Sequence, residues 1–589
     1  MDGLTASWWV IAAILYFALP GLPIIALLRR RKLISIADGL VLVPVISISV
    51  SITTMVISYF TLGLNFGAIS WAIITLTIAV VCTVLYAFSL LKRKESIKNH
   101  ILWIVSEIKS RIKPFILKRN TMILLGIIGL ALLFSYFPRI DYVHPLHSDE
   151  WHYWGYAENM VDRGTWTFTV PYYGWDMSGH AESGFLLFIG TFQNLSALDW
   201  NTVFIVLPLL ITLVAVLLAY RIGKAIEAGL TSALFVAMLP TGLRFLGMGF
   251  LVPLSLGLCI ILALLLLVLK LNSLFPIPVI LLTLAFLLLV HPPSALVAIV
   301  VLFSGGIIFL AYKRWWEGAS LVLICISIVG LAISLPSLWT GSLWAAGGFE
   351  ILDLGNFFLP EATMNMYIET FGFWLFILGF IGGLLLAKER KSAGFAVLTA
   401  VGFVGGLALG LRYVFNRITD IQALHDRTVF LFFGLSAFPS GKSASWLWGT
   451  SKTVAVAAIS ISIVASAYIH VSTPYYHIVT EDEYQDFVWI RDNLGANYTK
   501  ALLDPWKAVA FGPVTRKLVY YKIPQGPDSN LEARIAAIQT FFGGNCTDTA
   551  FLLANGINIV YTQTQVDNPL LTEVHPHVYV LESQNVHRA

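Results

Sequence analysis

Acidic and aromatic side chains gather in one stretch of the chain, residues 138–182. Its acidic residues are Asp141, Asp149, Glu150, Glu158, Asp162, Asp176 and Glu182, and its aromatic residues are Tyr142, Trp151, Tyr153, Trp154, Tyr156, Trp166, Phe168, Tyr172, Tyr173 and Trp175. Carboxylates accept hydrogen bonds from hydroxyl groups, and flat rings cover the C–H face of a pyranose. This combination suits carbohydrate binding. The alternative is an interfacial aromatic belt with solvated acids.

The order of residues within this stretch is a second signal. The segment His147-Ser148-Asp149-Glu150-Trp151-His152-Tyr153, followed by Ala157 and Arg163-Gly164, resembles the Asp-Glu motif of the GT-C superfamily. These are membrane glycosyltransferases that use polyprenyl- or dolichyl-phosphate sugars. In that family the motif lies on a loop after the outer end of a transmembrane helix. Here the loop follows the fourth expected span, so three spans precede the family's usual start.

The resemblance implies an inverting transfer, in which one carboxylate removes the proton from the acceptor hydroxyl. The leaving lipid phosphate is already a stable anion, so no general acid is required, unlike in glycoside hydrolysis. Asp149 matches the first acid of the motif and is the expected base. Glu150 is expected to be a second acceptor for the sugar, or a metal ligand if a divalent ion takes part.

Other side chains of the same stretch are candidate substrate ligands. Tyr153 belongs to the motif and offers a ring and a hydroxyl. Asp176, His180 and Glu182 end the stretch and are also expected to bind substrate. For these three, a solvated or helix-capping role is an equal alternative.

The departing phosphate needs a cation at the same membrane level. Arg427 directly precedes an apolar run and resembles the phosphate-binding arginine of several GT-C families. Arg244, and His291 before a double proline, are expected at the same outer face, where helix-end anchoring is the alternative for all three. With Asp149, they come from four distant segments. Two further arginines, for which anchoring is favoured, are Arg412 and Arg417.

The elements that must position these residues are membrane spans. Of the 589 residues, 58% are hydrophobic and 12% are charged, whereas a soluble domain has about 25% charged residues. A soluble enzyme and a disordered chain are therefore excluded. Apolar stretches long enough to cross a bilayer recur through residues 1–470, and we expect about 14 transmembrane helices in a mainly α, GT-C-like bundle.

Basic residues indicate the orientation of this bundle. Alternating the spans from an outer N-terminus places 23 of the 37 Lys and Arg residues in cytoplasmic segments. The richest of these segments, 92–120, is expected to be a basic amphipathic helix on the inner surface, attracted to anionic lipid. The chain is therefore predicted to be a multi-pass cell-membrane protein whose 138–182 loop lies outside.

The composition changes after residue 470. Residues 471–589 contain 12 of the 33 acidic residues and no long apolar run. Thr480-Glu481-Asp482-Glu483 is a capping box, which predicts a helix start, and the short apolar runs at 500–503, 517–523, 557–562 and 577–581 are expected to be strands. A small extracytoplasmic α/β domain is predicted for 471–589. By family analogy alone it would help to bind the acceptor.

Proteins of another class provide the main alternative. Ion-coupled transporters place ionisable residues near the membrane midplane, and the expected spans hold almost none there. A lipid-glycan flippase or a ligase that joins whole glycans stays open, since both handle lipid phosphates. The oligosaccharyltransferases are less favoured because their Trp-Trp-Asp-Tyr-Gly signature is absent.

The expected partners follow from this interpretation. They are a polyprenyl- or dolichyl-phosphate sugar donor, a glycan, lipid or protein acceptor, and membrane lipid. No nucleic acid is expected. No cofactor is required by the residues, and no cluster of cysteines suggests a metal site. The nucleotide-binding GxG-type loops of enzymes that use nucleotide sugars are not evident, which fits a lipid-linked donor.

Overall fold

The computed structural model describes residues 3–30, 33–92, 119–241, 246–334, 371–415, 422–472, 475, 477–523 and 531–581. The chain divides into two compact units. The helical unit comprises Met1–Val143 and His180–Pro474, and the mixed unit comprises His144–Gly179 and Tyr475–Ala589. Most of the acidic and aromatic stretch thus packs with the C-terminal residues. The sequence-based division at residue 470 could not include this, because no local pattern links segments more than 300 residues apart.

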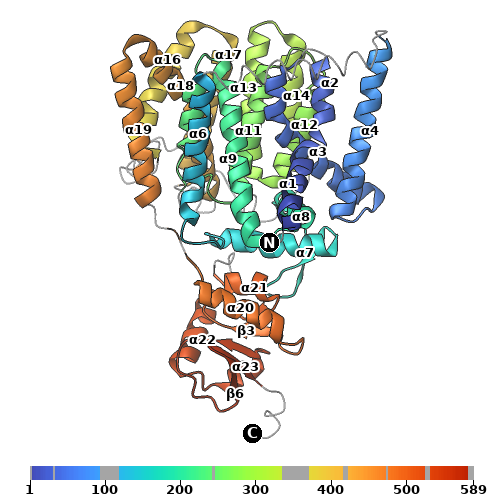
Figure 1. Ribbon diagram of the computed structural model, residues 1–589, viewed down its shortest axis with the longest axis vertical. Coiled ribbons are helices and arrows are strands. Elements are labelled where there is room, and N and C mark those ends of the chain that lie inside the picture. The colour runs from blue at the N-terminus through green and yellow to red at the C-terminus, as the bar shows by residue number, and fades with distance from the viewer. Residues whose placement is uncertain are drawn as a thin grey trace. The chain divides into compact units, whose positions relative to one another are not determined.

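The helical unit consists of helices that run alongside one another (Figure 1). They are α1 (Gly3–Ala18), α2 (Gly21–Arg30), α3 (Ile36–Leu62), α4 (Ala68–Lys92), α6 (Arg119–Tyr136), α8 (Ser183–Ser196), α9 (Trp200–Ala225), α10 (Gly229–Ala237), α11 (Pro253–Leu269), α12 (Ile277–Val290), α13 (Pro292–Ala311), α14 (Trp315–Ser334), α16 (Phe373–Glu389), α17 (Ser392–Phe415), α18 (Gln422–Thr450) and α19 (Lys452–Ser472). The short 3-10 turn Phe137–Arg139 follows α6.

Several of these helices have the length and composition of membrane spans. Among the described residues, seven helices are long and apolar enough to cross a membrane, or eight if the bent pair α1 and α2 is one span. Helix α4 shows the reason, because Ile69, Leu76 and Phe88 are all exposed along it. Such an exposed apolar stripe is an aggregation hazard in water. By contrast, α11 is apolar and buried almost all round, as expected of a helix at the centre of a bundle.

Two expected spans differ from single straight helices. The apolar stretch 7–28 is broken at Leu19 and Pro20, where α1 and α2 meet at 41°, because proline cannot continue the helical hydrogen bonding. The apolar stretch that starts at Gly229 contains the nine-residue helix α10, and residues 238–241 that follow are not helical. Of the described helices, α11, α12 and α14 are shorter apolar helices, so the expected total of about 14 stays a prediction.

Buried ion pairs join the helix ends that the sequence places on one face. Asp38, which is 1% exposed, accepts a hydrogen bond from Arg221 at 2.7 Å and lies 3.6 Å from Lys270. Lys442 of α18 lies 2.5 Å from Glu389 at the end of α16. These pairs link α3 to α9 and to the end of α11, and they link α16 to α18.

The C-terminal part of the mixed unit is a five-stranded sheet with helices. The strands β3 (Lys500–Leu502), β4 (Leu518–Val519), β5 (Ile559–Tyr561), β6 (Leu571–His575) and β7 (Val578–Leu581) follow the order β4-β3-β5-β7-β6. β4, β3 and β5 are parallel, while β7 and β6 are antiparallel. The helices are α20 (Glu481–Asn493), α21 (Ala508–Thr515), α22 (Leu531–Gly543) and α23 (Thr549–Ala554), and α20 starts with the capping box predicted at Thr480.

The rest of the mixed unit comes from the acidic and aromatic stretch. Helix α7 (Ser148–Arg163) is followed by a hairpin of β1 (Thr167–Thr169) and β2 (Asp176–Ser178). Gly155 lets α7 approach α21, because a Cβ there would lie 3.1 Å from Pro513. Arg516 after α21 pairs with Glu158 of α7 at 2.5 Å. The hydroxyl of Tyr172 donates to the carbonyl of Val509.

Candidate functional site

The expected base lies in the first turn of α7. The helix begins because the imidazole of His147 caps it, with Nδ1 accepting from the backbone N–H of Asp149 at 3.1 Å. An acidic residue is favourable at this end of a helix, since it faces the positive end of the helix dipole. The carboxylate of Asp149 is 29% exposed, so it is held by the helix and is accessible to a substrate.

A buried lysine lies beside this carboxylate. Lys522 is 5% exposed, and its Nζ lies 2.5 Å from Nε2 of His152 and 4.6 Å from the ring centroid of Tyr172. Burial lowers the pKa of Lys522 to about 7, and the negative charge of Asp149 opposes this shift. The mixed unit therefore holds a cation with a pKa near neutral pH whose charge interacts with that of the expected base.

The helical period of α7 arranges further groups around Asp149. Residues three and four positions apart share a face of a helix, so His152 and Tyr153 follow Asp149 on one side. The ring of His152 also meets the ring of Tyr172 edge-on, at 5.4 Å between centroids. Tyr153 is half-buried. This face presents a carboxylate, an imidazole and rings, which are the group types that sugar binding uses.

Glu150 has a different position from the one that its predicted substrate role requires. Its side chain is fully buried, and its Oε2 accepts a hydrogen bond from the backbone N–H of Leu146 at 2.6 Å. The carboxylate thus fixes the chain just before α7. Because the side chain has no exposed surface for a sugar to contact, we assign Glu150 to positioning of the helix start.

Asp176 likewise has protein partners. Its Oδ1 accepts from Nη1 of Arg163 at 2.8 Å and from the hydroxyl of Thr169 at 3.0 Å. These bonds fasten the β1–β2 hairpin to the last turn of α7. The carboxylate is more than half exposed. We interpret Asp176 as a residue that stabilises the hairpin, whereas the sequence suggested a substrate ligand.

A second group of predicted residues meets in the helical unit. His291 caps α13, with its Nδ1 accepting from the backbone N–H of Ser294 at 3.3 Å. Its other nitrogen, Nε2, lies 3.9 Å from Oε1 of Glu182, which precedes α8. Because Nδ1 accepts this hydrogen bond, the neutral ring carries its proton on Nε2, facing the carboxylate.

Arg427 belongs to the same group. It lies in the first turns of α18, half-buried, close enough to His291 for its charge to act on the imidazole. The preceding residues, His425 and Asp426, are buried and pair with each other at 3.0 Å. The structure thus brings together Glu182, His291 and Arg427 from three helix ends. The sequence placed His291 and Arg427 on one face, but it did not predict their meeting with Glu182.

His180 has a capping role next to this group. The imidazole Nδ1 accepts from the backbone N–H of Glu182 at 3.1 Å, and the backbone N–H of His180 donates to the hydroxyl of Ser183. Burial lowers the pKa of His180 to about 4, so the ring is neutral at physiological pH. It shapes the start of α8. Three other predictions, Arg244, Arg417 and nearly all of the basic segment 92–120, lie outside the described residues.

Sequence reasoning missed Lys522 and His152. Lys522 is one of eight basic residues after residue 470, and nothing in its neighbourhood distinguishes it from a solvated lysine. His152 lies inside the motif, and its spacing of three from Asp149 places both on one face only when 148–163 is a helix.

The residues do not form a metal site in the part of the chain that is described. No group of three or more His, Cys, Asp or Glu side chains there could hold a metal ion. Glu150, the expected ligand if a divalent ion takes part, instead holds the N–H of Leu146. The donor set therefore gives no support to a divalent ion at Asp149.

Comparison with known proteins gives no family by sequence, since no family model and no curated protein matches the chain. Solved structures of the Archaeoglobus fulgidus oligosaccharyltransferase are similar to it. The apo form is 14% identical with a TM-score of 0.48, over 74% of this chain and 69% of that chain. The form tethered with an acceptor peptide is 13% identical with a TM-score of 0.47, over the same shares.

The same enzyme in complex with zinc and sulfate is 13% identical with a TM-score of 0.46, over 74% of this chain and 67% of that chain. At this level of identity the likeness assigns no residue role to the present chain. The roles proposed below rest on the groups around Asp149 and around Arg427.

Proposed function

We propose that this chain is an inverting, GT-C-like membrane glycosyltransferase, which moves a sugar from a polyprenyl-phosphate donor to a glycan, lipid or protein acceptor on the outer face of the membrane. The observation that carries the proposal is the partly exposed carboxylate of Asp149 at the start of α7, whose charge acts on the buried Lys522, in a unit that has no membrane span among its described helices. A membrane bundle joined to such a carboxylate suits a reaction between a lipid substrate and a water-exposed acceptor.

The proposed step needs one base. The oxygen of the acceptor hydroxyl attacks the anomeric carbon, and its proton passes to the carboxylate of Asp149. The bond between the anomeric carbon and the phosphate oxygen breaks, and its electron pair leaves with the lipid phosphate. No oxidant or second acid is required, because the phosphate leaves as a stable anion.

Lys522 supports the base through its charge. An anionic donor repels a carboxylate and would favour its protonated, inactive form. An ammonium group next to Asp149 offsets that repulsion. Burial of Lys522 strengthens the interaction, since charges attract more strongly away from water. His152 and Tyr172 hold the lysine in place.

The helical unit is assigned to the donor. Arg427 would bind the phosphate, because a guanidinium forms strong, charge-assisted hydrogen bonds with phosphate oxygens. Glu182 and His291 would contact the sugar, with the carboxylate accepting hydroxyl protons. This division of labour agrees with the resemblance of Arg427 to the phosphate-binding arginine of GT-C families.

The proposal is tested with the purified full chain in lipid nanodiscs. It is supplied with polyprenyl-phosphate sugars and a panel of glycan and peptide acceptors, and released polyprenyl phosphate and the anomeric configuration of the product are measured. We expect turnover with inversion of configuration. Movement of intact donor across the bilayer without any release of polyprenyl phosphate would instead support a flippase.

A further inference from the structure

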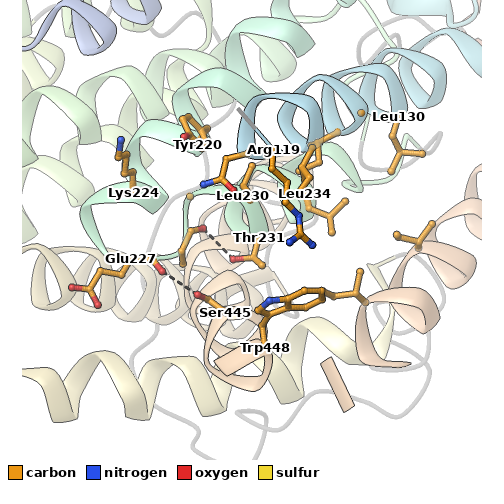
Figure 2. A pocket seen from close by; sticks show the side chains of 18 residues that line it. Arg119, Leu130, Tyr220, Lys224, Glu227, Leu230, Thr231, Leu234, Ser445 and Trp448 are labelled. Atoms are coloured by element: carbon orange, nitrogen blue, oxygen red, sulfur yellow. Dashed lines mark hydrogen bonds between the residues drawn. The ribbon is translucent and has the colours of Figure 1, made fainter. Parts of the chain in front are cut away.

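A cavity of about 760 Å³ lies in the helical unit, remote in sequence from the groups described above. It is lined by the start of α6, the end of α9, the turn leading into α10, and parts of α18 and α19. Figure 2 shows Arg119 and Lys224 at its margin, with the indole of Trp448 across from Arg119. The walls beyond these cations are largely apolar.

The apolar wall adjoins surface that faces hydrocarbon. Ile123 and Ile127 of α6, together with Ile459 and Ile463 of α19, line the cavity at helical spacing. Their helical neighbours are exposed, among them Leu125, which is 54% exposed. Since α6 and α19 are both candidate membrane spans, a molecule entering between them would come from the lipid phase.

The length of the cavity matches one leaflet. Its lining runs along α6 from Arg119 to Leu130, which is about 16 Å at the rise of an α-helix. Half of a bilayer's hydrocarbon core is about 15 Å. The charges therefore lie at headgroup level when the apolar wall lies among the acyl chains. A free anion such as phosphate would fill only the end of the cavity that carries the cations and would leave the apolar part empty.

The charge at the headgroup end is positive. Arg119 and Lys224 are exposed cations, while Glu227 nearby is occupied by other lysines, with Lys391 at 2.5 Å and Lys442 at 3.7 Å. The hydroxyl of Ser445 donates to the carbonyl of Glu227 (Figure 2). Arg119 and Lys224 thus bring two positive charges to the lining of the cavity, which an anion would complement.

We propose that this cavity binds one anionic phospholipid of the surrounding bilayer, with its phosphate held by Arg119 and Lys224 and an acyl chain lying along α6. The site is independent of the proposed transfer reaction. It belongs to the face that the sequence assigns to the cytoplasm, where anionic lipids attract basic residues. It would fasten α6 to α19.

Glycine positions on α6 provide a matched pair of variants. A Cβ added at Gly126 or at Gly129 meets nothing within 4 Å, so a side chain can start from either position without a clash at its Cβ. Only Gly126 lines the cavity. Gly126→Leu therefore fills the proposed acyl path, whereas Gly129→Leu adds the same side chain one turn away.

The test is native mass spectrometry of the full chain, released from detergent with phosphatidylglycerol, with phosphatidylcholine or with inorganic phosphate. We expect one tightly retained phosphatidylglycerol, and an apparent affinity that falls about tenfold or more in Arg119→Gln/Lys224→Gln and in Gly126→Leu. Gly129→Leu and the exposed-cation control Lys313→Gln should retain it.

Three results would overturn the proposal. Equal retention of both lipids would show that the charges do not select the ligand. Equal affinity of Gly126→Leu and Gly129→Leu for phosphatidylglycerol would place the acyl chain elsewhere. Binding of inorganic phosphate without any retained lipid would reduce the site to its cations.

Discussion

The amine nitrogen of Lys522 lies 2.5 Å from Nε2 of His152, although 370 residues separate them in sequence. One of the two nitrogens must donate to the other, so the pair shares a proton in a buried setting. Asp149 precedes His152 by three residues on the same helix, and its charge acts on the lysine. The expected base is therefore part of an assembled group rather than a lone carboxylate.

This relationship predicts a pH effect on turnover. With a pKa of about 7, Lys522 loses its charge as the pH rises through neutrality, and activity should fall over that interval. In Lys522→Arg the guanidinium stays protonated, so the falling limb should move to higher pH. The pH profile of kcat/KM is the measurement. If the activity of both proteins falls over the same pH interval, Lys522 is not the group that controls this pH dependence.

The same pKa predicts how stability depends on pH. An unfolded lysine keeps a pKa near 10.5, so between about pH 7 and 10.5 the unfolded chain binds more protons at this position than the folded one. The contribution of Lys522 to the free energy of unfolding therefore rises with pH across that interval. Urea unfolding of the mixed unit should show this rise, and Lys522→Met should lack it.

Arg427→Ala is expected to weaken donor binding more than acceptor binding, because the arginine would hold the phosphate. A charged hydrogen bond contributes about 1.5–3 kcal/mol, so donor affinity should fall about tenfold or more. Titration of the variant with polyprenyl phosphate measures the effect. Arg412→Ala is the matched control, since anchoring is favoured there. An unchanged donor affinity in Arg427→Ala would show that Arg427 only anchors the helix end.

Glu150→Ala should act on stability instead of substrate affinity. The buried carboxylate accepts from the N–H of Leu146, and loss of a buried partner costs about 1–3 kcal/mol. We expect a lower Tm with unchanged KM for donor and acceptor. A raised KM at full stability would restore the substrate role that the sequence suggested.

Much of the architecture follows from the sequence because it depends on local rules. The length of the apolar runs identifies the spans, and the capping box at Thr480 fixes the start of α20. The sequence also predicted one outer membrane face for Glu182, His291 and Arg427, but it did not predict that these three side chains meet.

The rest depended on packing that no local pattern encodes. The assignment of Asp149 to one unit with Lys522 arises from contacts such as Gly155 against Pro513 and Glu158 with Arg516, across more than 300 residues. Glu150 looked like a site residue because burial cannot be read from its place in a motif. Acidic residues at a helix start serve capping as readily as catalysis.

The central claim is that Asp149 removes the acceptor proton. Single-turnover transfer from a polyprenyl-phosphate sugar is measured in wild type, in Asp149→Asn and in Asp162→Asn, an exposed aspartate on the same helix. We predict that Asp149→Asn lowers the rate about a hundredfold or more with unchanged Tm and donor binding, while Asp162→Asn stays near wild type. Wild-type transfer by folded Asp149→Asn would contradict the account.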